Sequence, residues 1–412
     1  MWWENAFLRW QKGKLYLGPW EARQLAEEHG TPLFIYSRQQ LLANLEKIRS
    51  AFSFQSELEL RVAYAMKANP HQEILKLFQT EGSWVDAVSP GEVQTALRAG
   101  FPAEKIIFTG TSISEEDLRA VMSHPGIIIN IDAAEQIPMM KKVQATFFPG
   151  RKYKVAVRWN PGLGKGFNPK VTTAGARTPD GTPIKFGVEA GKVVAVFEQA
   201  RRAGFSVVGF HQHLGSGWTA ADWPVVKEAV GRMVKKAAEL SQFGFNLDFL
   251  DFGGGISPSY KEKQKAFPLN KYARFICEEI KKANLALKQI VLEPGKFLVA
   301  DAGVLLVKVV YTKKSYGNHF VCVNAGTYNT VPRPAIYPEA HHEIINCVTR
   351  RTARRKVTIA GHLCETGDIF GYDRLMPLPR PGDILAVLHA GAYGHSMASC
   401  FNLRQIPPEI II

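Results

Sequence analysis

The chain has 412 residues, of which 46% are hydrophobic, so it is long enough for two domains with a large packed core. Its 51 basic and 37 acidic residues give a net charge of +14, but the basic residues are dispersed and form no recognisable nucleic-acid motif. The sequence contains no apolar run of about eighteen residues and no basic segment followed by an apolar core at its N-terminus. We therefore expect a globular, cytoplasmic protein without a nucleic-acid or membrane partner.

Apolar runs typical of β-strands alternate with amphipathic stretches typical of helices between residues 61 and 293. The expected strands are 61–66, 84–88, 106–109, 127–131, 153–159, 207–213, 247–252 and 290–293. The expected helices are 71–80, 90–99, 114–124, 133–145, 191–203, 221–243 and 270–284, several of them with Ser, Asp or Asn caps. Parallel β/α units in this number predict an α/β fold, a (β/α)8 TIM-type barrel, which we place over residues 31–300.

The pattern changes after about residue 303. β-rich segments at 304–312, 320–324, 356–360 and 383–389 are divided by Gly and Pro turns, without long helices. They predict a second, C-terminal all-β domain, a barrel or sandwich, over residues 301–412. Residues 1–30 are assigned to the same domain, to which the run at 14–17 can add a strand.

Lys67 stands directly after the first apolar run and before the Asn69-Pro70 breaker. A lysine at the C-terminal mouth of a buried strand can be desolvated and made nucleophilic, as a Schiff-base lysine requires. Most lysines that end a strand are solvated rim residues, so the position alone is weak evidence.

Other polar and Gly-rich residues fall at the same ends of the expected strands, where barrels of this kind carry their chemistry. They are Asp86, Ser89, Arg158, Asn160, His213, the triplet Gly253-Gly254-Gly255, and Glu293. Each one alone is more often structural, because a strand-end Asp or His usually caps a turn. Their convergence on one rim favours a site.

These residues suit an aromatic phosphate cofactor. Consecutive glycines let backbone N–H groups approach a phosphate, although a plain loop is as common. His213 can stack on a planar ring while Ser216 donates to the phosphate, and Glu293 can face a pyridine nitrogen and keep the ring protonated. A metal pair from His211 and His213 is disfavoured, because no carboxylate or Cys ligand is near them in sequence. The five scattered cysteines likewise form no CxxC pair, so we expect no metal.

Six motifs, in order, resemble the fold type III pyridoxal-phosphate decarboxylases of the diaminopimelate and ornithine decarboxylase family. They are Tyr64-Ala65-Met66-Lys67-Ala68-Asn69, His213-Leu214-Gly215-Ser216, Gly253-Gly254-Gly255, Glu293-Pro294-Gly295, Cys364-Glu365-Thr366-Gly367-Asp368 and Gly391-Ala392-Tyr393-Gly394. The resemblance runs nearly from end to end. It implies pyridoxal 5'-phosphate as the cofactor and a homodimer with shared active sites.

The resemblance also implies roles for individual residues. Lys67 would form the Schiff base, His213 would stack on the ring, and Glu293 would meet the pyridine nitrogen. The remaining expected cofactor contacts are Asp86, Ser216, Gly253, Gly254, Gly255 and Tyr393. In the family, Cys364 and Glu365 reach the site from the partner subunit, with the cysteine near the carbon that is reprotonated.

The expected substrate follows from a further likeness. Arg333-Pro334-Ala335-Ile336-Tyr337 resembles the segment with which diaminopimelate decarboxylases grip a distal carboxylate, and a forked guanidinium suits that group. The predicted reaction is decarboxylation of meso-diaminopimelate to L-lysine, with Lys296, Arg333, Tyr337 and Glu365 as substrate-binding residues. Lys296 departs from the family's usual Arg and cannot supply a bidentate grip.

Three alternatives remain open from the sequence. A decarboxylase for D-ornithine, D-lysine, or a siderophore or polyamine intermediate would share these motifs. An alanine-racemase-like enzyme would share the barrel, but the Cys364-Glu365 motif argues against it. A non-catalytic regulator with this fold is disfavoured because Lys67, His213 and Cys364 are all present. The Gly/Pro-rich stretch 161–187 is read as a loop over the site, and a solvated insertion is equally compatible with its composition.

Overall fold

The computed structural model describes residues 1–349 and 353–412. They form two compact units. The barrel unit comprises Lys47–Ser257 and Lys265–Gly295, and the β unit comprises Met1–Glu46, Pro258–Gln264 and Lys296–Ile412. Among the described residues, none of the helices combines the length and the apolar character needed to cross a membrane.

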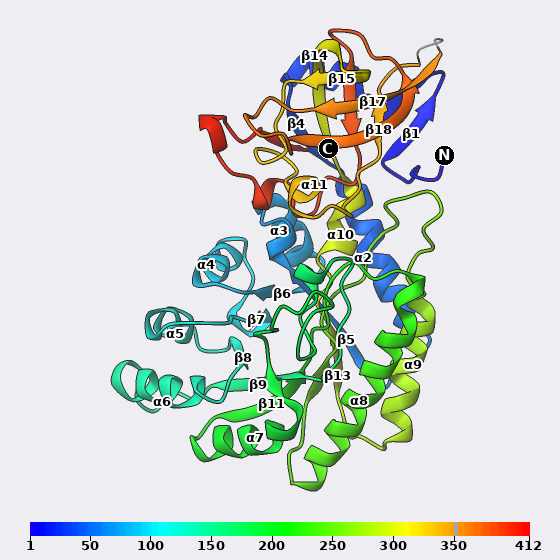
Figure 1. Ribbon diagram of the computed structural model, residues 1–412. Helices are drawn as coiled ribbons and strands as arrows, with labels where there is room; N and C mark the ends of the chain where they lie inside the picture. Colours follow the sequence, from blue (N-terminus) through cyan, green and yellow to red (C-terminus); the bar gives the residue numbers. More distant parts are fainter. Residues whose placement is uncertain (350–352) are drawn as a thin grey trace. The chain divides into compact units, whose positions relative to one another are not determined.

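The barrel unit is built on a closed ring of parallel strands (Figure 1). In ring order they are β5 (Glu59–Ala65), β6 (Trp84–Ala87), β7 (Ile106–Phe108), β8 (Ile128–Ile131), β9 (Lys154–Asn160), β11 (Ser206–His211), β12 (Phe249–Asp251) and β13 (Gln289–Leu292). The pairings of β8 with β9 and of β13 with β5 complete the ring, and the short β10 (Val188–Glu189) adds to β9. The predicted TIM-type barrel is confirmed, with strands at all of the expected positions.

Helices connect these strands on the outside of the ring (Figure 1). They are α3 (Gln72–Thr80), α4 (Pro90–Arg98), α5 (Glu115–Met122), α6 (Gln136–Phe147), α7 (Val193–Arg202), α8 (Trp223–Gln242) and α9 (Leu269–Lys282). Their starts follow local sequence signals. Ser89 caps α4, which begins at Pro90, by accepting a hydrogen bond from the Glu92 amide. Ser114 and Asp117 form a reciprocal capping box at the start of α5.

Side chains from alternating positions fill the interior of the barrel. One buried layer consists of Ala63, Ile107, Ile128, Ala156, Phe249 and Val291. The large ring of Phe249 occupies the space beside Gly209 of β11, where an added Cβ would lie 2.1 Å from the ring. The interior is therefore packed at this level, and ligand space is restricted to the ends of the strands.

The β unit contains a mixed sheet that is nearly closed into a barrel, which confirms the predicted second β domain. Its strands are β16 (Ile344–Asn346), β19 (Ile384–Val387), β14 (Gly303–Ser315), β15 (Asn318–Val323), β17 (Arg354–Ala360) and β18 (Ile369–Pro377), with β4 (Leu33–Tyr36) on β14 and β20 (Glu409–Ile411) on β4. The β4–β20 and β15–β17 pairs are parallel. The helices that begin in this unit are α1 (Ala22–His29), α2 (Arg38–Phe52), α10 (Lys296–Val299) and α11 (Arg333–Ile336).

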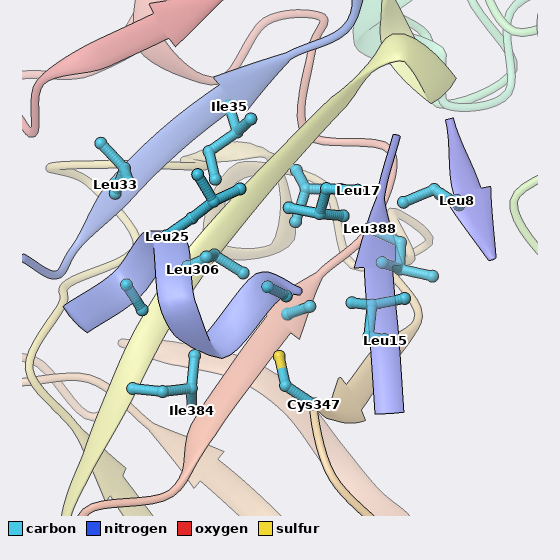
Figure 2. Close-up of a cluster of buried hydrophobic side chains, with 14 of the residues drawn as sticks. Leu8, Leu15, Leu17, Leu25, Leu33, Ile35, Leu306, Cys347, Ile384 and Leu388 are labelled. Atoms are coloured by element: carbon cyan, nitrogen blue, oxygen red, sulfur yellow. The ribbon is translucent and has the colours of Figure 1, made fainter. Parts of the chain in front are cut away.

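The expected strand at residues 14–17 forms, but it lies in a sheet of its own. It is β2 (Lys14–Leu17), which pairs with β1 (Leu8–Gln11) and β3 (Trp20–Glu21). Figure 2 shows how Leu15 and Leu17 of β2 meet Leu306 of β14 and Leu388 in one buried cluster. Each such leucine contributes about 1.5–3 kcal/mol by leaving water, so this core joins the N-terminal segment to the C-terminal strands.

Candidate active site

Lys67 is the middle residue of a 3-10 turn that begins where β5 ends. The turn, Met66–Ala68, is closed by the Tyr64 hydroxyl, which donates to the Asn69 carbonyl at 2.8 Å. Asn69 and Pro70 then lead the chain out of the rim toward α3. The buried β5 and this fixed turn direct the lysine into the mouth of the barrel, as the sequence predicted.

The Lys67 amine is paired with a buried carboxylate. Its Nζ donates to Asp86 Oδ2 at 2.7 Å, and Asp86, on the adjacent strand β6, is fully buried while the Lys67 side chain is 33% exposed. Burial raises the pKa of Asp86 and the Glu293 charge adds to this, whereas the Lys67 charge opposes both. The pair gives the amine a fixed direction and a local proton acceptor.

His213 follows β11 and faces the same mouth. Its Nδ1 accepts from the Gly254 amide at 3.1 Å, which requires an unprotonated nitrogen at that position. Burial and the nearby Lys67 charge hold the pKa of His213 well below its usual range. The ring is thus a neutral imidazole whose orientation is set by backbone.

The Gly triplet after β12 allows very close backbone packing. A Cβ on Gly254 would lie 2.2 Å from the Glu293 carbonyl oxygen, and Gly255, at φ +117°, packs against Trp218. The amides of Gly253 and Gly254 donate to Asp251 and His213. The triplet therefore orients other site residues, and its predicted contact with a phosphate, like that of Ser216, stays a prediction.

Glu293, which follows β13, belongs to a buried cluster. Its Oε2 lies 3.2 Å from His211 Nε2, while its Oε1 is buried without a hydrogen-bond partner among the described residues. Burial opposes ionisation of Glu293, but the charge and hydrogen bond of His211, with the Lys67 charge, lower its pKa to about 2. Burial and the Glu293 charge raise the pKa of Asp251 well above its usual value.

A cavity of about 310 Å³ opens among these side chains within the barrel unit, a size suited to a small organic ligand. It brings together four predicted residues, Lys67, Arg158, His213 and Glu293, with Asp86 bonded to the first of them. The other residues that line it are Val88, Thr109, Thr111, Thr173, Lys185 and Phe186.

The stretch 161–187 forms part of this cavity. Thr173, Lys185 and Phe186 line it, and the amides of Lys165 and Thr173 donate to the Leu214 carbonyl. Arg158 stacks on the Phe186 ring at 4.6 Å, and Asp132 accepts from the Gly187 amide at 2.9 Å. The interpretation as a loop at the site is therefore favoured over a solvated insertion.

The predicted substrate residues lie in the β unit, as does Tyr393. Arg333 begins α11 and stacks on the Tyr260 ring at 5.1 Å, and Lys296 lies 5.7 Å from the centre of the Tyr393 ring. Lys296 and Arg333 are both buried. Burial and the Arg333 charge hold the pKa of Lys296 well below its usual value, so an anion would be favourable beside these two groups. Tyr337 ends α11.

Cys364 and Glu365 occupy an exposed turn between β17 and β18. The buried Asp368 carboxylate fixes this turn by accepting hydrogen bonds from the Leu363 amide at 2.7 Å and from the Thr327 amide. Asn402 brackets the cysteine: its Oδ1 accepts from the Cys364 amide at 3.0 Å and its Nδ2 lies 3.1 Å from Sγ. The thiol is thus fixed in place yet accessible.

Sequence reasoning missed several of these residues. Asp251 and His211 are hydrogen-bonded to site residues, although no carboxylate lies near His211 in sequence. The structure supplies two carboxylates, because β11, β12 and β13 are adjacent and in register. Thr109, Asp132 and Phe186 were also missed. Thr109 is the last residue of one expected strand and Asp132 directly follows another, which is an available signal. Phe186 lies in the stretch 161–187, but nothing in the sequence distinguishes it from its neighbours there.

A family model, "Pyridoxal-dependent decarboxylase, pyridoxal binding domain", matches residues 38–300. The diaminopimelate decarboxylase of Methanothermobacter thermautotrophicus is 33% identical over 97% of this chain and 91% of its own length.

Two crystal structures are also similar. Diaminopimelate decarboxylase from M. jannaschii, in complex with L-lysine, superposes with a TM-score of 0.90 at 31% identity, covering 99% of this chain and 93% of that one. The Helicobacter pylori enzyme, also with L-lysine, gives 0.86 at 29% identity, with 94% and 93% covered.

Proposed function

Because the chain belongs to the pyridoxal-dependent decarboxylases, we propose that it converts meso-diaminopimelate to L-lysine and carbon dioxide, with pyridoxal 5'-phosphate as cofactor. The observation that carries the proposal is the placement of Lys67, His213 and Glu293 around one cavity at the carboxyl ends of the barrel strands. Similarity to diaminopimelate decarboxylases over nearly the whole length supports the substrate.

The residues of the barrel unit fit this cofactor. Lys67 supplies the amine for covalent attachment, and the unpartnered Glu293 Oε1 is an acceptor suited to a protonated pyridine nitrogen. His213 presents a neutral ring to the cavity, which can lie against an aromatic face without adding charge. We assign the phosphate to Ser216, the Gly triplet and Tyr393.

Bound there, the cofactor supplies a sink for the electron pair released when the bond between the α-carbon and its carboxylate breaks. Asp86 holds the Lys67 amine and can accept its proton, so the amine can act as a nucleophile. Glu293 stays ionised at neutral pH, which keeps a negative charge available for the ring nitrogen. Carbon dioxide leaves, and one proton is added at the α-carbon to give L-lysine.

Lys296 and Arg333 are proposed to bind the distal carboxylate. The buried Arg333 guanidinium favours an anionic group, which would in turn favour the charged form of the buried Lys296 amine. Both side chains disfavour a distal amine, which separates a diaminopimelate enzyme from one acting on ornithine. Tyr337 and Glu365 are proposed to contact the substrate as well. Because Lys296 cannot form a bidentate grip, Arg333 would supply most of the directional binding.

Cys364 is proposed to deliver the proton to the α-carbon in the site of a partner subunit. The thiol is exposed on this chain and held by Asn402, as a group that serves a second copy would be. An isologous dimer would place it in both sites by symmetry. Because this thiol must stay reduced, we place the enzyme in the cytoplasm.

Because Lys296 stands where the family usually has Arg, one alternative function is tested as well, namely decarboxylation of another amino acid with a distal carboxylate or a D-centre. The test is carbon dioxide release from meso-diaminopimelate, its LL isomer, and D- and L-ornithine and lysine. We expect the highest kcat/KM for meso-diaminopimelate. A higher value for any other substrate would overturn the assignment while leaving the family intact.

A further inference from the structure

Behind the cavity, three buried groups from adjacent strands surround the Glu293 carboxylate. His211 ends β11, Asp251 ends β12 and Glu293 follows β13, and one ligand-type atom of each lies within 4.8 Å of the others. His211 Nε2 contacts Glu293 Oε2 at 3.2 Å, and Asp251 Oδ1 accepts from the Gly253 amide at 2.9 Å. Glu293 lines the cavity, whereas His211 and Asp251 do not.

The charges of this cluster cannot all be present at once. Two ionised carboxylates this close in a buried site repel strongly, so one of them binds a proton. Other titratable or cationic groups of the described residues that act on the cluster are Lys67, Asp86, Arg158, His213 and Tyr272. Lys67 and His211 favour the charge on Glu293. A charge on Asp251 would be stabilised mainly by the hydrogen bond from the Gly253 amide.

We propose that His211 and Asp251 are positioning residues for Glu293: His211 holds Oε2, Asp251 is a neutral carboxylic acid, and Oε1 is left as the acceptor for the cofactor's ring nitrogen. This inference rests on the proposed cofactor site but not on the identity of the substrate. It assigns tasks to two residues that touch neither the cavity nor the substrate.

The geometry favours this arrangement over a divalent cation held by the same three groups. A cation would be repelled by the Lys67 ammonium and by the buried Arg158 guanidinium, both of which line the adjoining cavity. It would also require Asp251 to lose its proton. Metal analysis of the purified holoenzyme is therefore part of the test, and a metal bound in equal amount to the protein and lost in His211→Gln would overturn the proposal.

The role of His211 is tested with a pair of variants. His211→Gln keeps a donor for Glu293, whereas His211→Leu removes it. A hydrogen bond to a charged group is worth enough to change an equilibrium about tenfold or more, so we expect the pyridoxal-phosphate dissociation constant to rise by at least that factor in His211→Leu and to be largely restored in His211→Gln. Equal dissociation constants for the two variants would overturn the role.

The protonation of Asp251 is tested by infrared spectroscopy of the holoenzyme at neutral pH. We expect a carbonyl band of a buried carboxylic acid that shifts in deuterated water and disappears in Asp251→Asn. Because Asn is neutral and nearly isosteric, Asp251→Asn should bind the cofactor like the wild type and keep the pH dependence of its visible absorbance.

A wild-type protein without that band, or an Asp251→Asn variant with strongly weakened cofactor binding, would show that Asp251 acts as an anion and would overturn the proposal. These measurements use no substrate. A failure of the proposed reaction would instead leave them unchanged and appear only in turnover assays.

Discussion

Arg333 offers the sharpest test of substrate recognition. The guanidinium is buried and stacked on Tyr260, so it is already oriented before a ligand binds. Replacing Arg333 with Ala would leave the distal carboxylate of meso-diaminopimelate in a buried position without its charged partner, which costs on the order of 3 kcal/mol or more. Since about 1.4 kcal/mol corresponds to a factor of ten in rate, kcat/KM should fall at least about a hundredfold.

The assay is carbon dioxide release at varied meso-diaminopimelate, with the cofactor absorbance recorded on the same samples. Arg354→Ala is the matched control, because Arg354 is an exposed arginine of the same unit whose guanidinium donates to the Leu375 carbonyl. It should behave like the wild type, and Arg333→Ala should retain full cofactor absorbance. Wild-type kinetics in Arg333→Ala would show that the distal carboxylate binds elsewhere.

Further outcomes are expected from the same structure. Lys67→Ala should abolish the borohydride-reducible bond to the cofactor, and peptide mapping that finds the adduct on another lysine would refute the assignment. Tyr260→Leu should raise KM for meso-diaminopimelate several-fold while Tyr260→Phe does not, because a cation–π contact is worth about 0.5–2 kcal/mol and Phe keeps the ring; equal KM values for the two variants would argue against the stacking. The folded-state pKa of Asp251 is raised above 3.8, so the folded protein holds a proton that the unfolded chain loses. Wild-type unfolding free energy should therefore decrease, relative to that of Asp251→Asn, as pH rises above about 4; parallel pH profiles in denaturant titrations would contradict this. Mixed dimers of Lys67→Ala and Cys364→Ala chains should regain activity that neither variant shows alone, in proportion to the heterodimer fraction measured by mass spectrometry. Confirmed exchange without recovery would place Cys364 outside the partner's site.

The barrel was predictable because its signals are local and repeated. Each strand is a short apolar run closed by Gly, Pro or a capping residue, and Ser89 and Ser114 mark helix starts by simple spacing. The rim residues Lys67, His213 and Glu293 followed from the rule that parallel barrels place their chemistry at strand ends.

The remaining structure depends on contacts between distant segments, which no local pattern reveals. β4 pairs with β14 and β20, whose residues lie more than about 250 positions further along the chain, so the pairing depends on tertiary contacts rather than on local sequence. Asp251 and His211 were missed as site residues for the same reason, since their task appears only when adjacent strands bring them to Glu293. The position of Phe186 at the site depends on its stacking with Arg158 of β9, a contact that no local pattern indicates.

The central claim is tested most directly by the products formed from meso-diaminopimelate. Purified holoenzyme should release carbon dioxide and L-lysine in equal amounts, with the amine identified by chiral chromatography, and Lys67→Ala should release neither. Formation of D-lysine, of a racemised substrate without carbon dioxide, or of no product by a protein that carries its cofactor would contradict the account.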